Sequence, residues 1–325
     1  MNASFADGPD HPLPPALLKG PELFQKWSQR RLQVEQRAAT PTVPLYHYTG
    51  ERALRGILQN QRPWCFSHLH QSDPNEFEYS LDLARQVLQR GMKREDFFES
   101  SLCGCLEDML KLRGLAGPFD FYLFSLSRHR DDPGQWETYG DHRRGFAIGF
   151  GPALLQPTHA TPLPNANENL WLGRVLYGND QTLARHQLVL DQACAIAKRI
   201  GHKNADWLRV FRPYPFIKAM AQEVMASQLI WNCLTAKEEN YRPEQEVRGI
   251  VMGVSERFTP YRKTFNDPVR GDRLYIEHPM ELKVPEHVAE IMVGPESLPG
   301  SEDMVRDLLR AEGYPDIPIV RSIIV

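Results

Sequence analysis

The sequence of 325 residues predicts an α+β fold. Short runs rich in β-branched and aromatic residues gather towards both ends of the chain, and amphipathic helical patterns lie between them. Because strands and helices do not alternate as βαβ units, the pattern favours a split, mainly antiparallel sheet with inserted helices. We expect residues 1–43 to form an arm with one helix, and residues 44–325 to form a single α+β domain.

The elements follow in order. Residues 1–20 are rich in Pro and Gly and are expected to be loose, whereas residues 21–39 read as a helix with Pro21 in its first turn. Apolar spacing then predicts a short strand within 44–49, helices at 51–58, 80–90 and 95–112, strands at 121–127 and 145–150, a loop at 156–168, a strand at 171–177, helices at 180–200 and 214–234, strands within 244–297, a helix at 301–312 and a terminal strand at 317–325.

The region between the strands at 121–127 and 145–150 is the most informative. Ser125 and Ser127 occupy alternate positions and therefore point to the same face of a strand. The polar connection that follows is roughly 17 residues, which is long for a hairpin and marks a candidate functional loop. It carries Trp136 and Tyr139, which lie three positions apart and so share one side of a helical turn.

Two further segments contain candidate catalytic or binding side chains. In Pro44-Leu-Tyr-His-Tyr-Thr-Gly50, His47 and Thr49 alternate with two tyrosines along a short strand. In Tyr241-Arg-Pro-Glu-Gln-Glu-Val-Arg248, Glu244, Glu246 and Arg248 are expected on one strand face. Two carboxylates at such spacing repel each other, which raises the pKa of at least one of them.

A strand with His-x-Thr, a strand with Ser-x-Ser and a strand with Glu-x-Glu, in this order, resemble the ADP-ribosyltransferase superfamily. Leu126 stands where that family usually has Thr. The resemblance implies a fold of that type and a transfer of ADP-ribose from the substrate NAD to a protein or nucleic-acid acceptor. It also implies a role as a bacterial toxin, effector or phage-defence enzyme.

The same resemblance assigns the site residues. Glu246 would be the catalytic glutamate and Glu244 would direct the acceptor. His47 and Thr49 would hold the ribose and amide of NAD, with Tyr48 between them also cofactor-binding. Ser125 and Ser127 would support the nicotinamide side, Trp136 or Tyr139 would stack on nicotinamide, and Arg143 could contact the pyrophosphate.

Residues 44–297 are also similar to a bacterial domain-of-unknown-function family, numbered two-nine-seven-one. Its landmarks are Tyr46-His-Tyr-Thr49, Asp73-Pro-Asn-Glu76, the Phe-Ser strand, Trp136-x-x-Tyr139 before Gly145-x-x-Ile-Gly-Phe150, Glu244-x-Glu-x-Arg248 and Ile291-Met-Val-Gly-Pro295. This likeness supplies no activity.

Composition narrows the possible classes. A net charge of −3 gives no general attraction to nucleic acid or to anionic membranes. The sequence holds no apolar run long enough to span a membrane and no visible secretory signal. Five scattered cysteines fit reduced thiols, so a cytoplasmic location is expected. The sequence lacks a phosphate-binding loop and a Gly-x-Ser-x-Gly elbow, which argues against kinase, simple NTPase and α/β-hydrolase functions.

Two alternatives stay open at this stage. His68, His70 and Asp73, with Glu76 and Glu78, could gather around a divalent metal in a nuclease, although Ser72–Glu76 also fits a turn and helix cap. A non-catalytic ligand sensor or interaction module on the same fold is the second alternative, because fold does not fix function.

Overall fold

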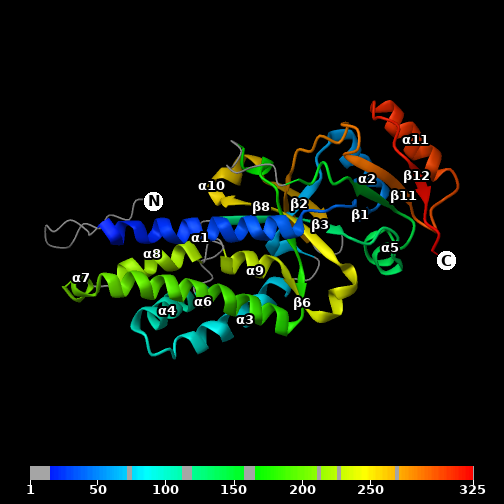
Figure 1. Cartoon of the computed structure of the whole chain (residues 1–325). Coiled ribbons are helices and arrows are strands. Elements are labelled where there is room, and N and C mark those ends of the chain that lie inside the picture. Colours follow the sequence, from blue (N-terminus) through cyan, green and yellow to red (C-terminus); the bar gives the residue numbers. More distant parts are fainter. Residues whose placement is uncertain are drawn as a thin grey trace. The chain divides into compact units, whose positions relative to one another are not determined.

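The computed structural model describes residues 15–71, 75–111, 119–156, 165–210, 214–224, 228–267 and 271–324. The chain divides into two compact units, each considered by itself (Figure 1). We call them the helical unit (Met1–Gln33, Glu78–Leu115 and Asn179–Leu234) and the sheet unit (Val34–Phe77, Ala116–Gly178 and Thr235–Val325). The expected arm at residues 1–43 and single domain at 44–325 stay predictions.

The helical unit is built from amphipathic helices that pack through small and aliphatic side chains. Its described helices are most of α1 (Pro15–Ala39) and α3 (Glu76–Gly91), with α4 (Phe97–Lys111), α6 (Asn179–Lys203), α7 (Ala205–Val210), α8 (Tyr214–Val224) and α9 (Ile230–Leu234). In α6, Val189, Ala193 and Ala197 recur at helical spacing and are fully buried. α4 packs against both α6 and α8.

The sheet unit contains the main sheet, in the order β12-β11-β4-β1-β3-β2-β10-β9, with β8 and then β5 attached to β3. Its strands are β1 (Leu45–Thr49), β2 (Trp64–Ser67), β3 (Phe119–Ser127), β4 (Phe146–Phe150), β5 (Trp171–Arg174), β8 (Glu246–Val254), β9 (Lys263–Asp267), β10 (Gly271–Glu277), β11 (Val288–Val293) and β12 (Ile319–Arg321). All of its pairings are antiparallel except that of β11 with β12.

Shorter elements connect these strands. They are α2 (Glu51–Asn60), η1 (His68–His70), α5 (Pro133–Tyr139), η2 (Ala166–Glu168), η4 (Glu239–Glu244), α10 (Ser255–Phe258), η5 (Thr259–Tyr261) and α11 (Ser301–Ala311), with β6 (Leu176–Tyr177) and β7 (Ala236–Lys237) forming a separate parallel pair. No described helix combines the length and apolar character that a membrane span requires.

Strand β3 is the branch point of the main sheet. Along one edge it pairs with β8 over its whole length, from Phe119 to Ser127. Along the other edge it pairs with β2 at Tyr122 and Leu123, and then with β1 at Ser127 alone. The sheet therefore splits beside Ser125, where β2 and β1 diverge.

The two faces of the sheet differ in chemistry. One face holds the main core, in which Phe124, Ile148, Val247 and Ile291 are buried with their neighbours. Because side chains alternate along a strand, Ser125, Ser127, Glu246 and Arg248 project from the opposite face. A smaller cluster of Tyr46, Tyr48, Trp136, Ala147 and Met292 lies on that opposite face.

The mixed α+β class and the mainly antiparallel sheet are confirmed. Helix α1 begins at Pro15, so the expected loose segment is wrong for residues 15–20, and Pro21 lies inside the helix. Pro15 takes the first turn, where a missing N–H costs nothing.

Two other boundaries differ from expectation. The predicted strand at 171–177 is broken, because Trp171–Arg174 pairs with β8 while Leu176–Tyr177 pairs with β7. The terminal strand spans only Ile319–Arg321: Ser322 N–H still donates to Val293 O of β11, but Ile323 N–H donates to the Asp131 carboxylate. The described residues of the predicted helix at 214–234 are helical, and residues 225–227 lie outside the described part.

Candidate functional site

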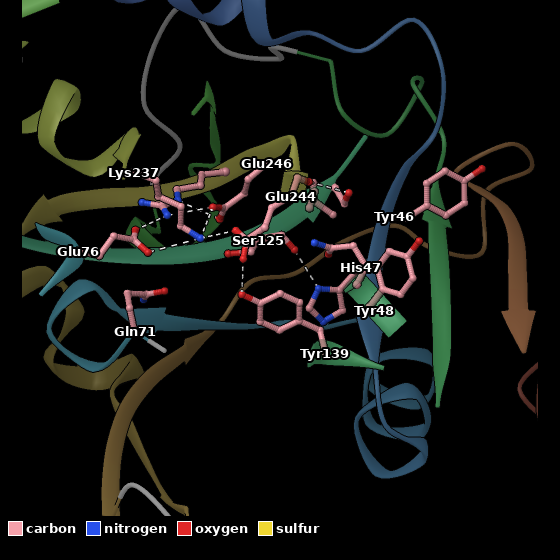
Figure 2. Close-up of a pocket in the computed structure, with 14 residues that line it drawn as sticks. Tyr46, His47, Tyr48, Gln71, Glu76, Ser125, Tyr139, Lys237, Glu244 and Glu246 are labelled. Atoms are coloured by element: carbon pink, nitrogen blue, oxygen red, sulfur yellow. Dashed lines mark hydrogen bonds and ion pairs between the residues drawn. The ribbon is translucent and has the colours of Figure 1, made fainter. Parts of the chain in front are cut away.

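A pocket opens beside the split between β1 and β3, mainly on the sheet face opposite the main core. His47 alternates with Tyr46 and Tyr48 and pairs with the core residue Ile148, so it reaches the pocket from the core side of β1. Figure 2 shows side chains from β1, β3, β7, η4 and β8 turned toward one another. Its volume is about 80 Å³, which is room for several water molecules or one small ring. His47, Ser125 and Glu246, which come from three distant parts of the chain, all line it.

Lys237 lies at the centre of a cluster of charges in this pocket. Its Nζ is 2.6 Å from Glu244 Oε2, 2.9 Å from Glu246 Oε2 and 3.4 Å from Glu76 Oε2. The Lys237 side chain is 7% exposed, so these ion pairs are largely shielded from water. Burial favours the neutral amine, but the three carboxylates outweigh burial and raise the pKa of Lys237.

Arg248 provides the second positive charge. Its Nε and Nη2 donate to the two oxygens of Glu246 at 2.9 and 3.0 Å, in a bidentate pair. Nη2 also bonds to the Glu76 carboxylate. Three carboxylates and two cations leave the cluster, when all are ionised, with a net charge of −1.

The carboxylates of the cluster differ in acidity. The pKa of Glu246 is lowered, because the attraction of Arg248 and Lys237 exceeds the opposing effect of burial. The pKa of Glu76 is raised, because burial outweighs the same two cations there. The expected repulsion between Glu244 and Glu246 does not raise the pKa of Glu246, since Lys237 lies between the two carboxylates.

Glu244 reaches the cluster from a turn, so its expected place on the strand face beside Glu246 is wrong. It ends η4, and Gln245 adopts a left-handed conformation (φ 43°) before β8 begins at Glu246. Ser127 Oγ fixes this turn by donating to Glu244 O at 2.9 Å and accepting from His129 N–H at 3.0 Å. Ser127 therefore holds the backbone that carries Glu244.

Two tyrosines hydrogen-bond to Glu244 and Glu246, and Tyr46 lines the pocket. Tyr139 donates from its hydroxyl to Glu244 Oε1 at 2.8 Å, and burial raises its pKa. The hydroxyl of Tyr177 accepts the Glu246 N–H at 2.7 Å. Tyr46 lines the far side of the pocket and donates to Glu290, which also pairs with Arg130.

His47 closes the split between β1 and β3. Its Nδ1 lies 3.0 Å from Ser125 O, and its ring centroid lies 4.6 Å from that of Phe124. Burial lowers the pKa of His47, which favours a neutral ring with Nδ1–H donating to this carbonyl. Ser125 itself is exposed, and its hydroxyl contributes to lowering the pKa of Glu246.

The remaining predicted residues separate into two groups. Tyr48 lines the pocket and donates to His129 O. Thr49, Trp136 and Arg143 lie outside the lining: Trp136 is fully buried against Tyr48, and Arg143 pairs with Glu296 at 3.2 Å. Tyr139 is therefore the aromatic side chain that this loop presents to the pocket.

The sequence interpretation missed the role of Lys237 and placed Glu76 in a different site. Lys237 directly follows the mostly apolar, buried run Ile230–Ala236. Because a buried lysine is almost always paired, a lysine at the end of such a run indicates a buried ion pair. Gln71 and Gln135 also line the pocket, and nothing in their local pattern marked them.

The metal site considered for His68, His70, Asp73, Glu76 and Glu78 is not assembled by the described residues. His68 Nδ1 faces the Phe121 carbonyl, His70 Nδ1 accepts the Leu274 N–H, and Glu76 pairs with Arg248 and Lys237. Asp73 is outside the described residues. Within the described part of the chain, no group of three His, Cys, Asp or Glu side chains is placed to hold a metal ion.

A family model described as protein of unknown function (DUF2971) matches residues 135–249. Residues 135–249 of this chain are therefore similar to that family. The family likeness predicted from the landmarks is thereby confirmed for residues 135–249, which hold Trp136-x-x-Tyr139, Gly145-x-x-Ile-Gly-Phe150 and Glu244-x-Glu-x-Arg248. The matched region supplies Tyr139, Lys237, Glu244, Glu246 and Arg248 of the pocket, whereas His47, Glu76 and Ser125 precede it.

No curated protein and no solved structure matches the chain. The resemblance to ADP-ribosyltransferases therefore stays a prediction.

Proposed function

We propose that this chain is an NAD-dependent ADP-ribosyltransferase that acts on a macromolecular acceptor. The observation that carries the proposal is the meeting of His47, Ser125 and Glu246 at one pocket, beside a split in the sheet. One substrate molecule must contact all three groups in such a reaction, so residues far apart in sequence have to be held together. A role as a toxin, effector or phage-defence enzyme stays a prediction.

The charge of the pocket suits this chemistry. Breaking the bond between ribose C1′ and the nicotinamide nitrogen sends the electron pair to nicotinamide and leaves positive charge on the ribose. An ionised Glu246, held in place before the reaction by Arg248 and Lys237, stabilises such a transition state. The lowered pKa of Glu246 keeps this carboxylate ionised at neutral pH.

Glu244 and Glu246 have different parts in the proposed reaction. Arg248 and Lys237 pair with both oxygens of Glu246, and Ser125 also hydrogen-bonds to this carboxylate. Glu246 therefore stabilises the positive charge on the ribose through its own negative charge. Glu244 is the more exposed of the two, at 15% against 4%. It accepts the acceptor's proton as the new bond to C1′ forms, while Tyr139 and Lys237 hold it in position.

A non-catalytic ligand-binding module is the second candidate. The observation that favours it is the complete pairing of Glu246, because a carboxylate with two cationic partners can serve structure alone. A transferase consumes NAD and a binding module does not, so the effect of Glu246→Gln on NAD consumption separates the two functions.

The test is incubation with NAD labelled in its ADP-ribose part and with cell extract. We expect wild-type protein to release nicotinamide and to place label on a macromolecule, and Glu246→Gln to lower the rate about 100-fold. Glu302→Gln, which alters an ion-paired carboxylate of α11 outside the pocket lining, is the matched control and should keep full rate. Equal slow consumption of NAD by wild type and Glu246→Gln would reject the transferase in favour of the binding module.

A further inference from the structure

A cluster of aromatic side chains covers part of the same sheet, on strands β2, β10 and β9. We call it the aromatic face, and it consists of Trp64, Phe66, Phe265 and Tyr275. In β2, Cys65 points into the main core, so Trp64 and Phe66 project from the opposite face. Trp64, Phe66 and Phe265 are partly exposed.

The rings stand in ordered contact. Trp64 stacks on Tyr275 with centroids 4.2 Å apart and planes at 27°, and Phe265 lies 5.5 Å from Trp64. The Arg273 guanidinium lies 4.0 Å from the centre of the Phe66 ring, and that of Arg52 lies 5.9 Å from Phe265. Flat rings beside guanidinium groups on a β-sheet surface suit a ligand that offers flat rings and phosphates.

The aromatic face is on the pocket side of the sheet. Phe66 lies opposite Leu123 of β3, and Leu123 alternates with Ser125 on the same face. Gln71, which lines the pocket, donates to the carbonyls of Phe66 and Ser67, while Arg273 donates to the carbonyl of His70. A chain-like ligand can therefore lie on the aromatic face and present one unit to the pocket.

The local charge favours an anionic ligand over a peptide of average charge. Arg52, Lys263 and Arg273 border the rings, whereas the carboxylates paired to them are those of Glu277 and Asp267. Among the described residues Arg52 forms no ion pair, so its charge is available to a phosphate. Three cations against two carboxylates leave this surface with a local charge of +1, although the whole chain carries −3.

We propose that the aromatic face binds single-stranded nucleic acid, which is then the acceptor class of the transferase. The acceptor assignment rests on the proposed function, whereas the binding does not. Unstacked bases lie on Trp64 and Phe265, and Arg52 contacts the backbone. Duplexes bind less well, because their bases are stacked on one another.

The test is fluorescence anisotropy with labelled oligonucleotides of one mixed sequence, as single-stranded DNA, single-stranded RNA and duplex, without NAD and at low salt. Phe265→Leu and Trp64→Leu should each weaken single-strand binding about 5- to 100-fold. Phe97→Leu is the matched control, because Phe97 is an exposed phenylalanine of the helical unit. Should Trp64→Leu fail to fold, Phe265→Leu on the edge strand β9 keeps the comparison.

Two further readouts complete the test. Arg52→Gln should reduce the slope of log affinity against log salt by about 0.7. No binding by wild type, or equal binding by Phe265→Leu and Phe97→Leu, overturns the proposal. Single-strand binding without NAD turnover supports nucleic-acid binding at the aromatic face and rejects the transferase function. NAD label that enters protein and never nucleic acid rejects this acceptor class and leaves the transferase standing.

Discussion

At the scale of single residues, Lys237 decides whether three carboxylates can share one pocket. Its ammonium contacts Glu76, Glu244 and Glu246, and its side chain is almost fully buried. A buried cluster of this kind contributes little net stability as a whole, yet removing one member leaves uncompensated charge.

We therefore expect Lys237→Met to lower the free energy of unfolding by about 3–5 kcal/mol. The variant leaves three carboxylates with Arg248 as their remaining cation, so the pKa of Glu246 should also rise. Urea unfolding followed by circular dichroism measures the loss. Lys263→Met is the control: Lys263 is half exposed in its pair with Glu277, so its removal should cost about 0–1 kcal/mol. Equal losses in both variants would contradict the account of the cluster.

At the scale of elements, the turn between α5 and β4 fixes the loop that presents Tyr139. A Cβ at Gly145 would lie 2.3 Å from Thr49 O and 2.8 Å from Gly140 O. These atoms belong to backbone, so they cannot yield as a flexible side chain can. Gly145 N–H also donates to Gly140 O, and Gly294 N–H donates to Gly145 O.

Gly145→Ala should consequently destabilise the protein by roughly 1–3 kcal/mol, as overpacking does. Gly56→Ala is the opposite case, because Gly56 lies within α2 and a Cβ there meets nothing within 4 Å. We expect Gly56→Ala to stabilise by about 0.5–1 kcal/mol through helix propensity. Thermal unfolding of the two variants tests both signs, and a stabilising Gly145→Ala would show that the turn is not tightly packed.

At the scale of the whole molecule, buried neutral histidines make stability depend on pH. Burial lowers the pKa of His68 and His278 to about 4 and that of His186 to about 3. In the unfolded chain each should titrate near 6.5, so below that pH the unfolded state binds more protons than the folded state. The stability that these histidines contribute is thus fully present above about pH 6.5 and is lost as the pH drops toward 4.

His278→Asn isolates one of these contributions. The amide can still donate to Asn167 O, which His278 Nδ1 now contacts at 2.6 Å, but it does not titrate. The loss of stability between pH 6.5 and 4 should shrink by roughly 3 kcal/mol. His142→Asn is the control, because His142 is exposed and its left-handed backbone (φ 49°) suits Asn. An unchanged pH profile in His278→Asn would show that folding does not lower the pKa of His278.

The sequence by itself determined the fold class and most of the elements. Period-two and helical patterns are local, so they identify β1, β3, β4 and the long helices without knowledge of their partners. The landmarks likewise predicted the family, and the alternate spacing of Ser125 and Ser127 placed both on one face.

The tertiary structure alone decided which charges meet. Lys237 and Glu76 are far apart in sequence, and their contact depends on where β7 and the start of α3 lie. The turn at Gln245 places Glu244 by a route that a strand pattern does not predict. The physical reason is that periodicity records which side of an element is buried, whereas ion pairing depends on distances between elements.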